Sequence, residues 1–345
     1  MAKRMLDCCA SDFAQFTKAD LLESIQKSEG RVIACETIGS VQPLLGNVTN
    51  AEFAASMGAD ILLLNLFDVQ QPVIHGLPPV EPGETIRLLK KLTGRPIGIN
   101  LEPVADDAEI ETDPMWAMSA GRRATVENAL RAKKLGIDFV LLTGNPGVGV
   151  TNTAIEQTLR RFKEAVGDSI VLAAGKMHAA GILSEAAENI MTEQDIASFV
   201  EAGADIILLP APGTVPGITQ EYAQRLITCA HQHGALTITS IGTSQEGADT
   251  DTIKRIALLC KISTTWAIPV TSGWPCRRIS WPTPSRCGAC GTLTTGWPAL
   301  LKDKSPLKIL TSAPVRVIIH KDNMVCGWFR ARNYGAREVF YYGTY

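Results

Sequence analysis

The sequence lacks three features that would point to a large or extended partner: an excess of charge, a long apolar run and an apolar N-terminal segment. It has 33 lysines and arginines against 35 aspartates and glutamates, which leaves little charge to hold nucleic acid or an anionic membrane. Its apolar runs, such as residues 61–64 and 206–209, fall far below the roughly 20 residues that span a bilayer. Residues 1–7 do not resemble a signal peptide. We expect a cytoplasmic protein whose partner is a small-molecule metabolite, with no nucleic acid and no membrane; a homo-oligomer is compatible with this composition.

Tryptophan is almost absent from the first 262 residues, where only Trp116 occurs. The other five tryptophans follow, together with four of the nine cysteines. These residues are Trp266, Trp274, Cys276, Trp281, Cys287, Cys290, Trp297, Cys326 and Trp328. The chain therefore has two compositions, and we treat residues 1–262 and 263–345 as separate parts.

Short apolar runs alternate with helical patterns through residues 1–262. Each run is rich in Ile, Val and Leu, and a glycine that can end the preceding helix comes before it. The predicted strands are Val32–Glu36, Ile61–Asn65, Ile97–Leu101, Phe139–Thr143, Ile170–Ala174, Ile206–Pro210 and Leu236–Ser240. The predicted helices between them are Asn50–Met57, Glu84–Leu92, Ala120–Leu135, Thr153–Val166, Glu193–Ala202 and Gln220–His233. Strands that are apolar at consecutive positions and separated by helices indicate a parallel sheet covered on both faces, so the fold class is α/β.

Three of these strands repeat one pattern, Gly-x-Asp followed by apolar residues, at 58–65, 136–143 and 203–210. They are the second, fourth and sixth strands, and this alternation favours a (β/α)8 TIM barrel, whose interior layers draw on alternate strands. An open doubly wound sheet is the alternative, but no Gly-x-Gly-x-x-Gly follows the first strand. We expect the repeated Asp60, Asp138 and Asp205 to assist the turn from helix to strand.

No eighth strand and helix can be read after the helical pattern of residues 253–261. Neither a helical nor a strand period is sustained there, and prolines stand at 269, 275, 282 and 284. We predict a TIM-barrel domain over residues 1–262, made of an N-terminal helix and seven βα units, whose eighth unit is lost.

The composition of residues 263–345 is typical of a GC-rich gene translated out of frame. Tryptophan has the single codon TGG. Restarting each codon on its third base turns Trp266 with its neighbour into glycine, and turns Trp274 and Trp281 with theirs into alanine. This frame permits a strand, a glycine turn and a helix, so we interpret the region as an aberrant tail produced by a frameshift. A zinc module built on Cys276, Cys287, Cys290 and Cys326 and a genuine but unusual tail are the alternatives.

Polar residues gather at the carboxyl ends of the predicted strands, where barrel enzymes carry their active sites. The sharpest is Lys176, because a lysine directly after an apolar strand is partly desolvated, which suits it to proton abstraction, Schiff-base formation or anion binding. The predicted catalytic residues are Lys176, His178, Glu36, Asn100 and Glu102. The oxygen ligands of Glu36, Asp68 and Glu102 could hold Mg²⁺, although pairing with Lys or Arg is the alternative.

Two glycine-bearing loops, residues 144–151 and 240–247, could bind phosphate through backbone amides at a helix start. The second follows the seventh strand, a frequent phosphate site in barrels. The predicted ligand-binding or phosphate-binding residues are Asn65, Asn145, Ser240, Gly242 and Thr243.

Four segments carry a resemblance to a known family. They read Ser28-Glu-Gly-Arg-Val-Ile-Ala-Cys-Glu36, Asn47-Val-Thr-Asn-Ala-Glu52, Gly58-Ala-Asp-Ile-Leu-Leu-Leu-Asn-Leu-Phe-Asp68 and Arg95-Pro-Ile-Gly-Ile-Asn-Leu-Glu-Pro103. Residues 1–262 resemble an uncharacterised bacterial barrel family with automatic names such as phosphoenolpyruvate phosphonomutase-like or haloacid dehalogenase-like. The phosphonomutase group carries a Lys-Lys-Cys-Gly-His loop, whereas this chain has only Lys176-Met177-His178. The haloacid dehalogenase motif is absent after the first strand, which ends Cys35-Glu36-Thr37.

These observations lead to a specific hypothesis about function. We expect a metal-assisted lyase or isomerase acting on a small phosphorylated or carboxylated metabolite, as the phosphonomutase-like resemblance implies. A non-catalytic metabolite-binding barrel and an inactive frameshifted product are the alternatives.

Overall fold

The structure is a computed structural model that describes residues 2–43, 45–104, 118–146, 149–241 and 248–263, and the backbone of 267–272, 315–319 and 325–329. The chain divides into two compact units, residues 1–300 and 301–345. Composition predicted a boundary at residue 262, and this position lies within the first of the two units. In the second unit, β9 (Val315–Ile319) pairs antiparallel with β10 (Val325–Phe329).

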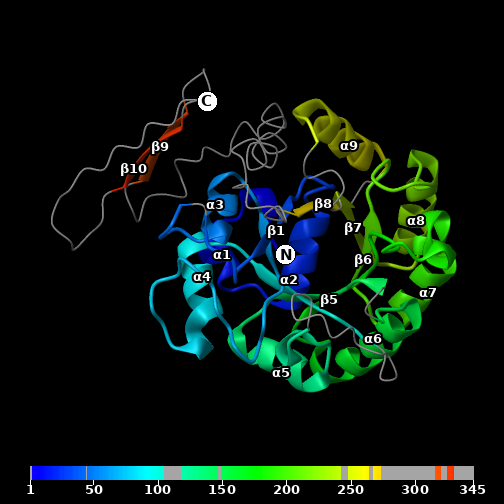
Figure 1. Ribbon diagram of the computed structural model, residues 1–345, viewed down its shortest axis with the longest axis horizontal. Coiled ribbons are helices and arrows are strands. Elements are labelled where there is room, and N and C mark those ends of the chain that lie inside the picture. The colour runs from blue at the N-terminus through cyan, green and yellow to red at the C-terminus, as the bar shows by residue number, and fades with distance from the viewer. Residues whose placement is uncertain are drawn as a thin grey trace. The chain divides into compact units, whose positions relative to one another are not determined.

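Eight parallel strands in sequence order close into a barrel in the first unit (Figure 1). They are β1 (Ala34–Ile38), β2 (Ile61–Asn65), β3 (Ile97–Leu101), β4 (Phe139–Leu142), β5 (Val171–Gly175), β6 (Ile206–Pro210), β7 (Leu236–Ile241) and β8 (Ala267–Ser272). All seven predicted strands are present, with bounds that differ by at most two residues. The α/β barrel architecture is thus confirmed.

The expectation that the eighth βα unit is lost needs a correction, because its strand is present. β8 pairs in parallel with β7 over residues 267–271 and with β1 over residues 270–272. Pro269 is tolerated inside this strand, although proline donates no backbone hydrogen bond. No helix follows β8 within the residues that the structure describes, so only the helical half of this unit is missing from the described fold.

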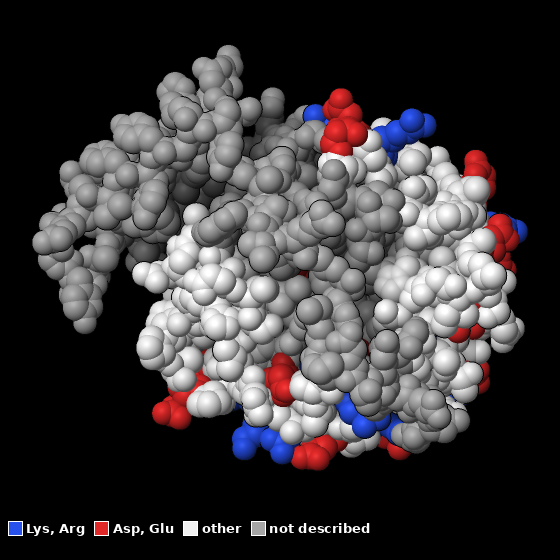
Figure 2. All heavy atoms as spheres, viewed as in Figure 1, with Lys and Arg blue, Asp and Glu red and all other residues white. Residues whose placement is uncertain are grey.

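Helices surround the strands on the outside, and consecutive helices from α3 to α9 contact one another (Figure 1). The helices are α1 (Ala10–Phe13), α2 (Lys18–Gln26), α3 (Asn50–Ser56), α4 (Thr85–Thr93), α5 (Val126–Leu135), α6 (Asn152–Val166), α7 (Glu193–Glu201), α8 (Gln220–Gln232) and α9 (Thr250–Ser263). Figure 2 shows acidic and basic side chains interspersed along the outer rim of the face in view. No described helix is long and apolar enough to cross a membrane.

Threonine caps determine where several of these helices begin. The side chains of Thr49 and Thr192 accept hydrogen bonds from the backbone three residues on and form capping boxes. Thr125 caps α5 in the same way, so this helix begins at Val126 and not at Ala120 as predicted. Residues 120–122 form a separate 3-10 turn, η3 (Ala120–Arg122).

The three repeated aspartates lie where the barrel strands begin, and each accepts a hydrogen bond from the backbone of the preceding strand. Asp60 accepts from Ile33 at 3.0 Å, and Asp138 accepts from Ile97 at 2.7 Å. Asp205 accepts from Leu172 at 2.8 Å. The aspartates thus lie at the predicted turns from helix to strand, and their hydrogen bonds tie neighbouring βα units together.

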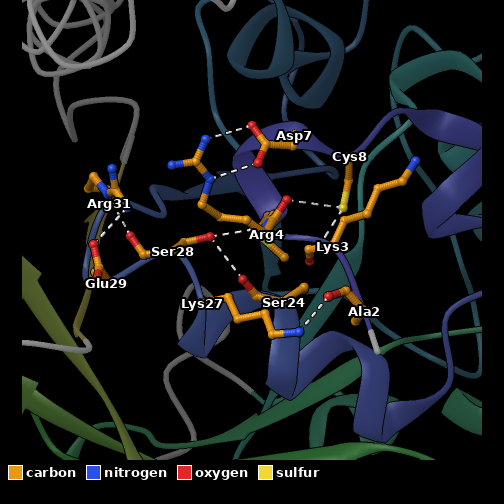
Figure 3. Close-up of polar contacts among 11 residues, drawn as sticks. Ala2, Lys3, Arg4, Asp7, Cys8, Ser24, Lys27, Ser28, Glu29 and Arg31 are labelled. Atoms are coloured by element: carbon orange, nitrogen blue, oxygen red, sulfur yellow. Dashed lines mark hydrogen bonds and ion pairs between the residues drawn. The ribbon is translucent and has the colours of Figure 1, made fainter.

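The N-terminal segment closes the same end of the barrel. Met5, Leu21 and Ile25 belong to the apolar cluster that fills the barrel interior. Lys18 at the start of α2 reaches Asp205 at 2.6 Å, which places this helix at the amino ends of the strands. Figure 3 shows the segment held to the C-terminal end of α2, where Lys27 Nζ donates to the Ala2 carbonyl at 2.8 Å. Ser28 Oγ also accepts a hydrogen bond from the Met5 amide at 3.0 Å. The carboxyl ends of the strands lie at the opposite end of the barrel, where catalytic groups are expected.

Candidate active site

Several predicted site residues share the strand face that points into the barrel. Side chains alternate between the two faces of a strand, and Ala34, Leu63 and Leu141 lie in the interior cluster. Two residues further along the same strands come Glu36, Asn65 and Thr143, and Asn100 and Ser240 have the equivalent position on β3 and β7. These five polar residues therefore follow the apolar filling at the carboxyl end of the interior.

Glu36 is the most perturbed group among them. It lies in the middle of β1 and is almost fully buried, with the residue 4% exposed. Asn65 Nδ2 donates to Glu36 Oε1 at 2.7 Å. Burial raises the pKa of Glu36 to about 7, although the Asn65 hydrogen bond acts in the opposite direction. Near neutral pH this carboxyl group therefore exists in both protonation states.

Asn65 is held so that its amide nitrogen must face Glu36. Its Oδ1 accepts a hydrogen bond from the Leu66 backbone amide at 2.8 Å. Leu66 has a positive φ of 56°, which is unfavourable for a leucine, so the surrounding structure holds this turn in place. The side-chain oxygen is occupied, and the NH₂ group is directed at the carboxylate.

Asn100 lies on β3, next to β2 in the barrel. Leu64 is paired with Ile99 in the register, so Asn65 and Asn100 are neighbours on adjacent strands and share the interior face. Asn100 Nδ2 donates to the Thr143 carbonyl at 3.1 Å. Its Oδ1 is buried, and no partner for it occurs among the described residues. A buried acceptor without a donor is costly, so this atom is available to a ligand hydroxyl or amine.

Glu102 follows β3 and is paired with Arg122, a residue that the sequence analysis did not select. The ion pair is largely shielded from solvent, since the two side chains are 10% and 17% exposed. Nothing in the sequence links these residues, which lie 20 positions apart. The geometry favours pairing with arginine, the alternative to metal binding.

Asp68 approaches the same arginine from the loop after β2. A Cβ atom on Gly121 would lie 1.7 Å from Asp68 Oδ1, so glycine at this position permits the two loops to meet. Burial raises the pKa of Asp68, but its hydrogen bonds, the strongest from Ser119, together with the charge of Arg122 bring the pKa below its ordinary value. Asp68 is therefore a carboxylate neutralised in part by Arg122.

The predicted metal set of Glu36, Asp68 and Glu102 needs a correction. Across the described part of the chain, no three His, Cys, Asp or Glu side chains are grouped so that they could hold a metal ion. Glu36 is bonded to Asn65, and Arg122 supplies the positive charge beside the other two. The residues present do not form the oxygen cage that the sequence suggested.

Lys176 follows β5 and is 1% exposed. Its Nζ forms an ion pair with Glu185 Oε2 at 2.6 Å, a second partner that sequence reasoning missed. His178 is half-buried, and burial together with the charge of Lys176 lowers its pKa. A neutral histidine and a buried ammonium group therefore lie beside each other at this end of the barrel.

The remaining predicted ligand residues are placed differently. Ser240 is fully buried, and its Oγ donates to Met177 Sδ at 3.6 Å, so it lies beside the segment that carries Lys176. Asn145 is exposed after β4. Gly242 and Thr243 lie outside the described residues, as do Cys276, Cys287 and Cys290 of the alternative zinc module.

Comparisons with known proteins agree with the barrel and leave the reaction open. A family model described as "Domain of unknown function (DUF7916)" matches residues 6–265. No curated protein matches the sequence. A structure of the carboxyl transferase domain of Rhizobium etli pyruvate carboxylase with pyruvate has a TM-score of 0.50 and 12% identity, covering 88% of this chain and 50% of that one.

Two further solved structures are similar at a lower level. The 2,3-dimethylmalate lyase, a member of the PEP mutase/isocitrate lyase superfamily, has a TM-score of 0.44 and 14% identity over 86% of this chain and 91% of its own. Phosphonopyruvate hydrolase in complex with oxalate and Mg²⁺ has a TM-score of 0.46 and 12% identity over 87% of this chain and 92% of its own. At such identities the likeness concerns the fold alone.

Proposed function

The chain belongs to the family described as domain of unknown function DUF7916, and we propose that this member is a lyase or isomerase that transfers a proton on a small carboxylated or phosphorylated metabolite. The observation that carries the proposal is Glu36, a buried carboxyl group with a pKa of about 7 at the catalytic end of a barrel. A general acid or base is most effective when its pKa lies near the working pH, and it contributes roughly 10²–10⁴ in rate.

Each remaining polar group has a part in this proposal. Asn65 holds one oxygen of Glu36, so the other exchanges the proton. Asn100 Oδ1 accepts a hydrogen bond from a substrate hydroxyl, and Lys176 binds the anionic group. In the lyase form, Glu36 takes the hydroxyl proton while the adjacent carbon–carbon bond breaks, the hydroxyl becomes a carbonyl, and the released carbon keeps the electron pair until it is protonated.

Magnesium has no step in this proposal. The carboxylates expected to hold it are engaged with Asn65 and Arg122, so this chain's described residues do not fit a three-carboxylate site. A requirement for Mg²⁺ would appear in the activity assay as loss on chelation and recovery when the ion is added back.

Small carboxylates are the first substrates to test. The barrel shared with the pyruvate carboxylase domain, at a TM-score of 0.50, supports the architecture, and that structure contains pyruvate. The buried ammonium group of Lys176 supports a substrate with a negative charge. We would screen pyruvate, hydroxy acids, keto acids and their phosphorylated counterparts, first by thermal shift and then by turnover.

The decisive variant is Glu36→Gln, which keeps the shape of the side chain and cannot accept the proton. We expect turnover of any substrate found in the screen to fall by about 10²–10⁴, with binding retained. Glu164→Gln on the exposed surface of α6 is the matched control and should keep full activity. Turnover that survives in Glu36→Gln would remove the basis of this function, whereas ligand binding without any turnover would favour the non-catalytic metabolite-binding barrel.

We also propose that a frameshift near residue 262 replaced the original end of the barrel. The family match ends at residue 265, close to the change in composition. On α9, Leu258 and Ile262 lie one helical turn apart and are each 57% exposed, which fits a face that the missing eighth helix would cover. DNA sequencing across codons 255–270 tests this proposal, and an uninterrupted frame that also encodes the same tail in sister genes would overturn it.

A further inference from the structure

The segment after β5 folds back over Lys176. It includes η5 (Leu183–Glu185), and Glu185 reaches the Lys176 ammonium group from nine residues further along the chain. Two alanines flank this short turn, Ala180 and Ala187, with positive φ angles of 50° and 56°. Such a conformation is unfavourable for an L-residue, so other contacts must hold the segment in this position.

Few contacts hold the segment between these alanines. Leu183 is 90% exposed, so its side chain contributes almost no packing. A Cβ atom on Gly181 would have no neighbour within 4 Å. Beyond Ala187 the chain is anchored, since Tyr222 Oη donates to the carbonyls of Glu188 and Met191, at 2.9 Å each.

The Lys176–Glu185 ion pair is the strong contact of this segment. Lys176 is nearly inaccessible, and an ammonium group removed from water needs an anionic partner. Glu185 supplies one at 2.6 Å while its own side chain stays 25% exposed. One partner belongs to the barrel and the other to a weakly packed turn, so the carboxylate can leave while the lysine stays.

We propose that Lys176 is an oxyanion-binding site, and that Glu185 occupies it in place of the carboxylate or phosphate group of the ligand. The entering anion displaces Glu185 and takes over its ion pair, and residues 180–187 move away. This inference rests on the proposed function for the role of Lys176 toward substrate, and it adds Glu185 as an internal competitor. The site selects negatively charged ligands because an uncharged one cannot replace the lost ion pair.

The test is binding of inorganic phosphate and of oxalate, measured by calorimetry on the full chain. Removing the competitor with Glu185→Gln should tighten binding of the matching anion by about tenfold, which corresponds to about 1.4 kcal/mol. Glu188→Gln removes the same charge just beyond this segment, and this control should bind as the wild type does. Lys176→Met should abolish binding, alone or together with Glu185→Gln. If Glu185→Gln tightens the binding of phosphate, the ligand carries a phosphate group. If it tightens the binding of oxalate, the ligand carries a carboxylate group.

A second measurement covers the case in which Glu185→Gln fails to fold, which melting curves would reveal. Leu183 is a chymotrypsin site within the segment, and saturating anion should speed cleavage there in the wild-type protein. An affinity in folded Glu185→Gln no tighter than in Glu188→Gln would overturn the proposal. So would a bound anion that leaves cleavage at Leu183 unchanged.

These results are separable from the fate of the proposed function, because anion binding is measured without turnover. Loss of turnover in Glu36→Gln together with unchanged affinity in Glu185→Gln would support the function and reject the competitor. Tighter anion binding in Glu185→Gln with no turnover of any compound would support the competitor and reject the proposed function.

Discussion

The two ends of the barrel differ in how some of their buried polar groups are paired. At the amino end, Asp60, Asp138 and Asp205 each accept a backbone hydrogen bond, and Lys18 pairs with the last of them. At the carboxyl end, Glu36 has a pKa of about 7, and Asn100 keeps a buried oxygen without a partner among the described residues. The first arrangement stabilises the fold, and the second leaves groups available to a ligand.

This difference gives a physical criterion for separating structural from functional polar residues in a barrel. A buried polar group with its partners made costs the native state little, whereas a buried group without a partner is costly, so an unpaired group at a strand end is a candidate for ligand binding.

The largest effect concerns Glu36 and the pH dependence of stability. The pKa of this carboxyl group rises from 4.5 to about 7 on folding, so between these values the native state binds a proton that the unfolded state releases. Stability should therefore fall as pH increases through this window, by roughly 3 kcal/mol in total. Glu36→Gln lacks this loss, so its free energy of unfolding relative to the wild type should increase with pH. Urea denaturation across the window measures it, and a difference independent of pH would contradict the prediction.

At the amino end, a substitution should lower the stability of the protein and leave its activity unchanged. Asp205→Ala removes the ion pair to Lys18 and the acceptor for the Leu172 amide, and should destabilise the protein by about 2–3 kcal/mol. Activity per folded molecule should not change. Asp168→Ala, at an exposed position in the turn before β5, should stay within about 0.5 kcal/mol of the wild type. A specific loss of turnover in Asp205→Ala would break the distinction between the two ends.

A smaller effect is expected for Asn65→Ala. Its hydrogen bond lowers the pKa of Glu36, so removing it should move the pKa, and the limb of the pH–rate profile that reports it, to higher pH. The shift should be on the order of one pH unit, because a hydrogen bond to a charged group is worth about 1.5 kcal/mol. If the limb does not move, a group other than Glu36 controls the rate.

The smallest effect concerns Leu258 on α9. Leu258→Ser should change the stability of this chain by no more than about 0.5 kcal/mol, because the side chain is mostly exposed. In a protein with the alternate reading frame restored, the same substitution should cost about 1–2 kcal/mol, because the eighth helix would bury the leucine. Equal costs in both proteins would argue against an eighth helix on this face.

Much of the barrel could be predicted from local patterns. Apolar runs after capping glycines located seven strands, and the helical patterns between them located the starts of α3 and α7. The eighth strand was missed because Pro269 and the surrounding residues have weak strand character, and only pairing with β7 and β1 holds them extended. The α5 boundary was missed because the cap at Thr125 was not recognised.

The sequence identified several residues of the site but not the residues with which they form ion pairs. Position at strand ends selected Glu36, Asn65, Asn100, Glu102 and Lys176, since the carboxyl ends of parallel strands meet at one end of a barrel. It could not show that Arg122 neutralises Glu102 or that Glu185 pairs with Lys176. These partners come from loops, whose return paths follow no periodic pattern.

The sequence by itself determined the architecture, because apolar periodicity, glycines and caps act through near neighbours along the chain. The tertiary structure decided the electrostatics, because desolvation and charge pairing depend on residues distant in sequence. Glu36 is an ordinary glutamate in the sequence, and it has a pKa of about 7 because the closed barrel removes water from it, an effect larger than that of the Asn65 hydrogen bond.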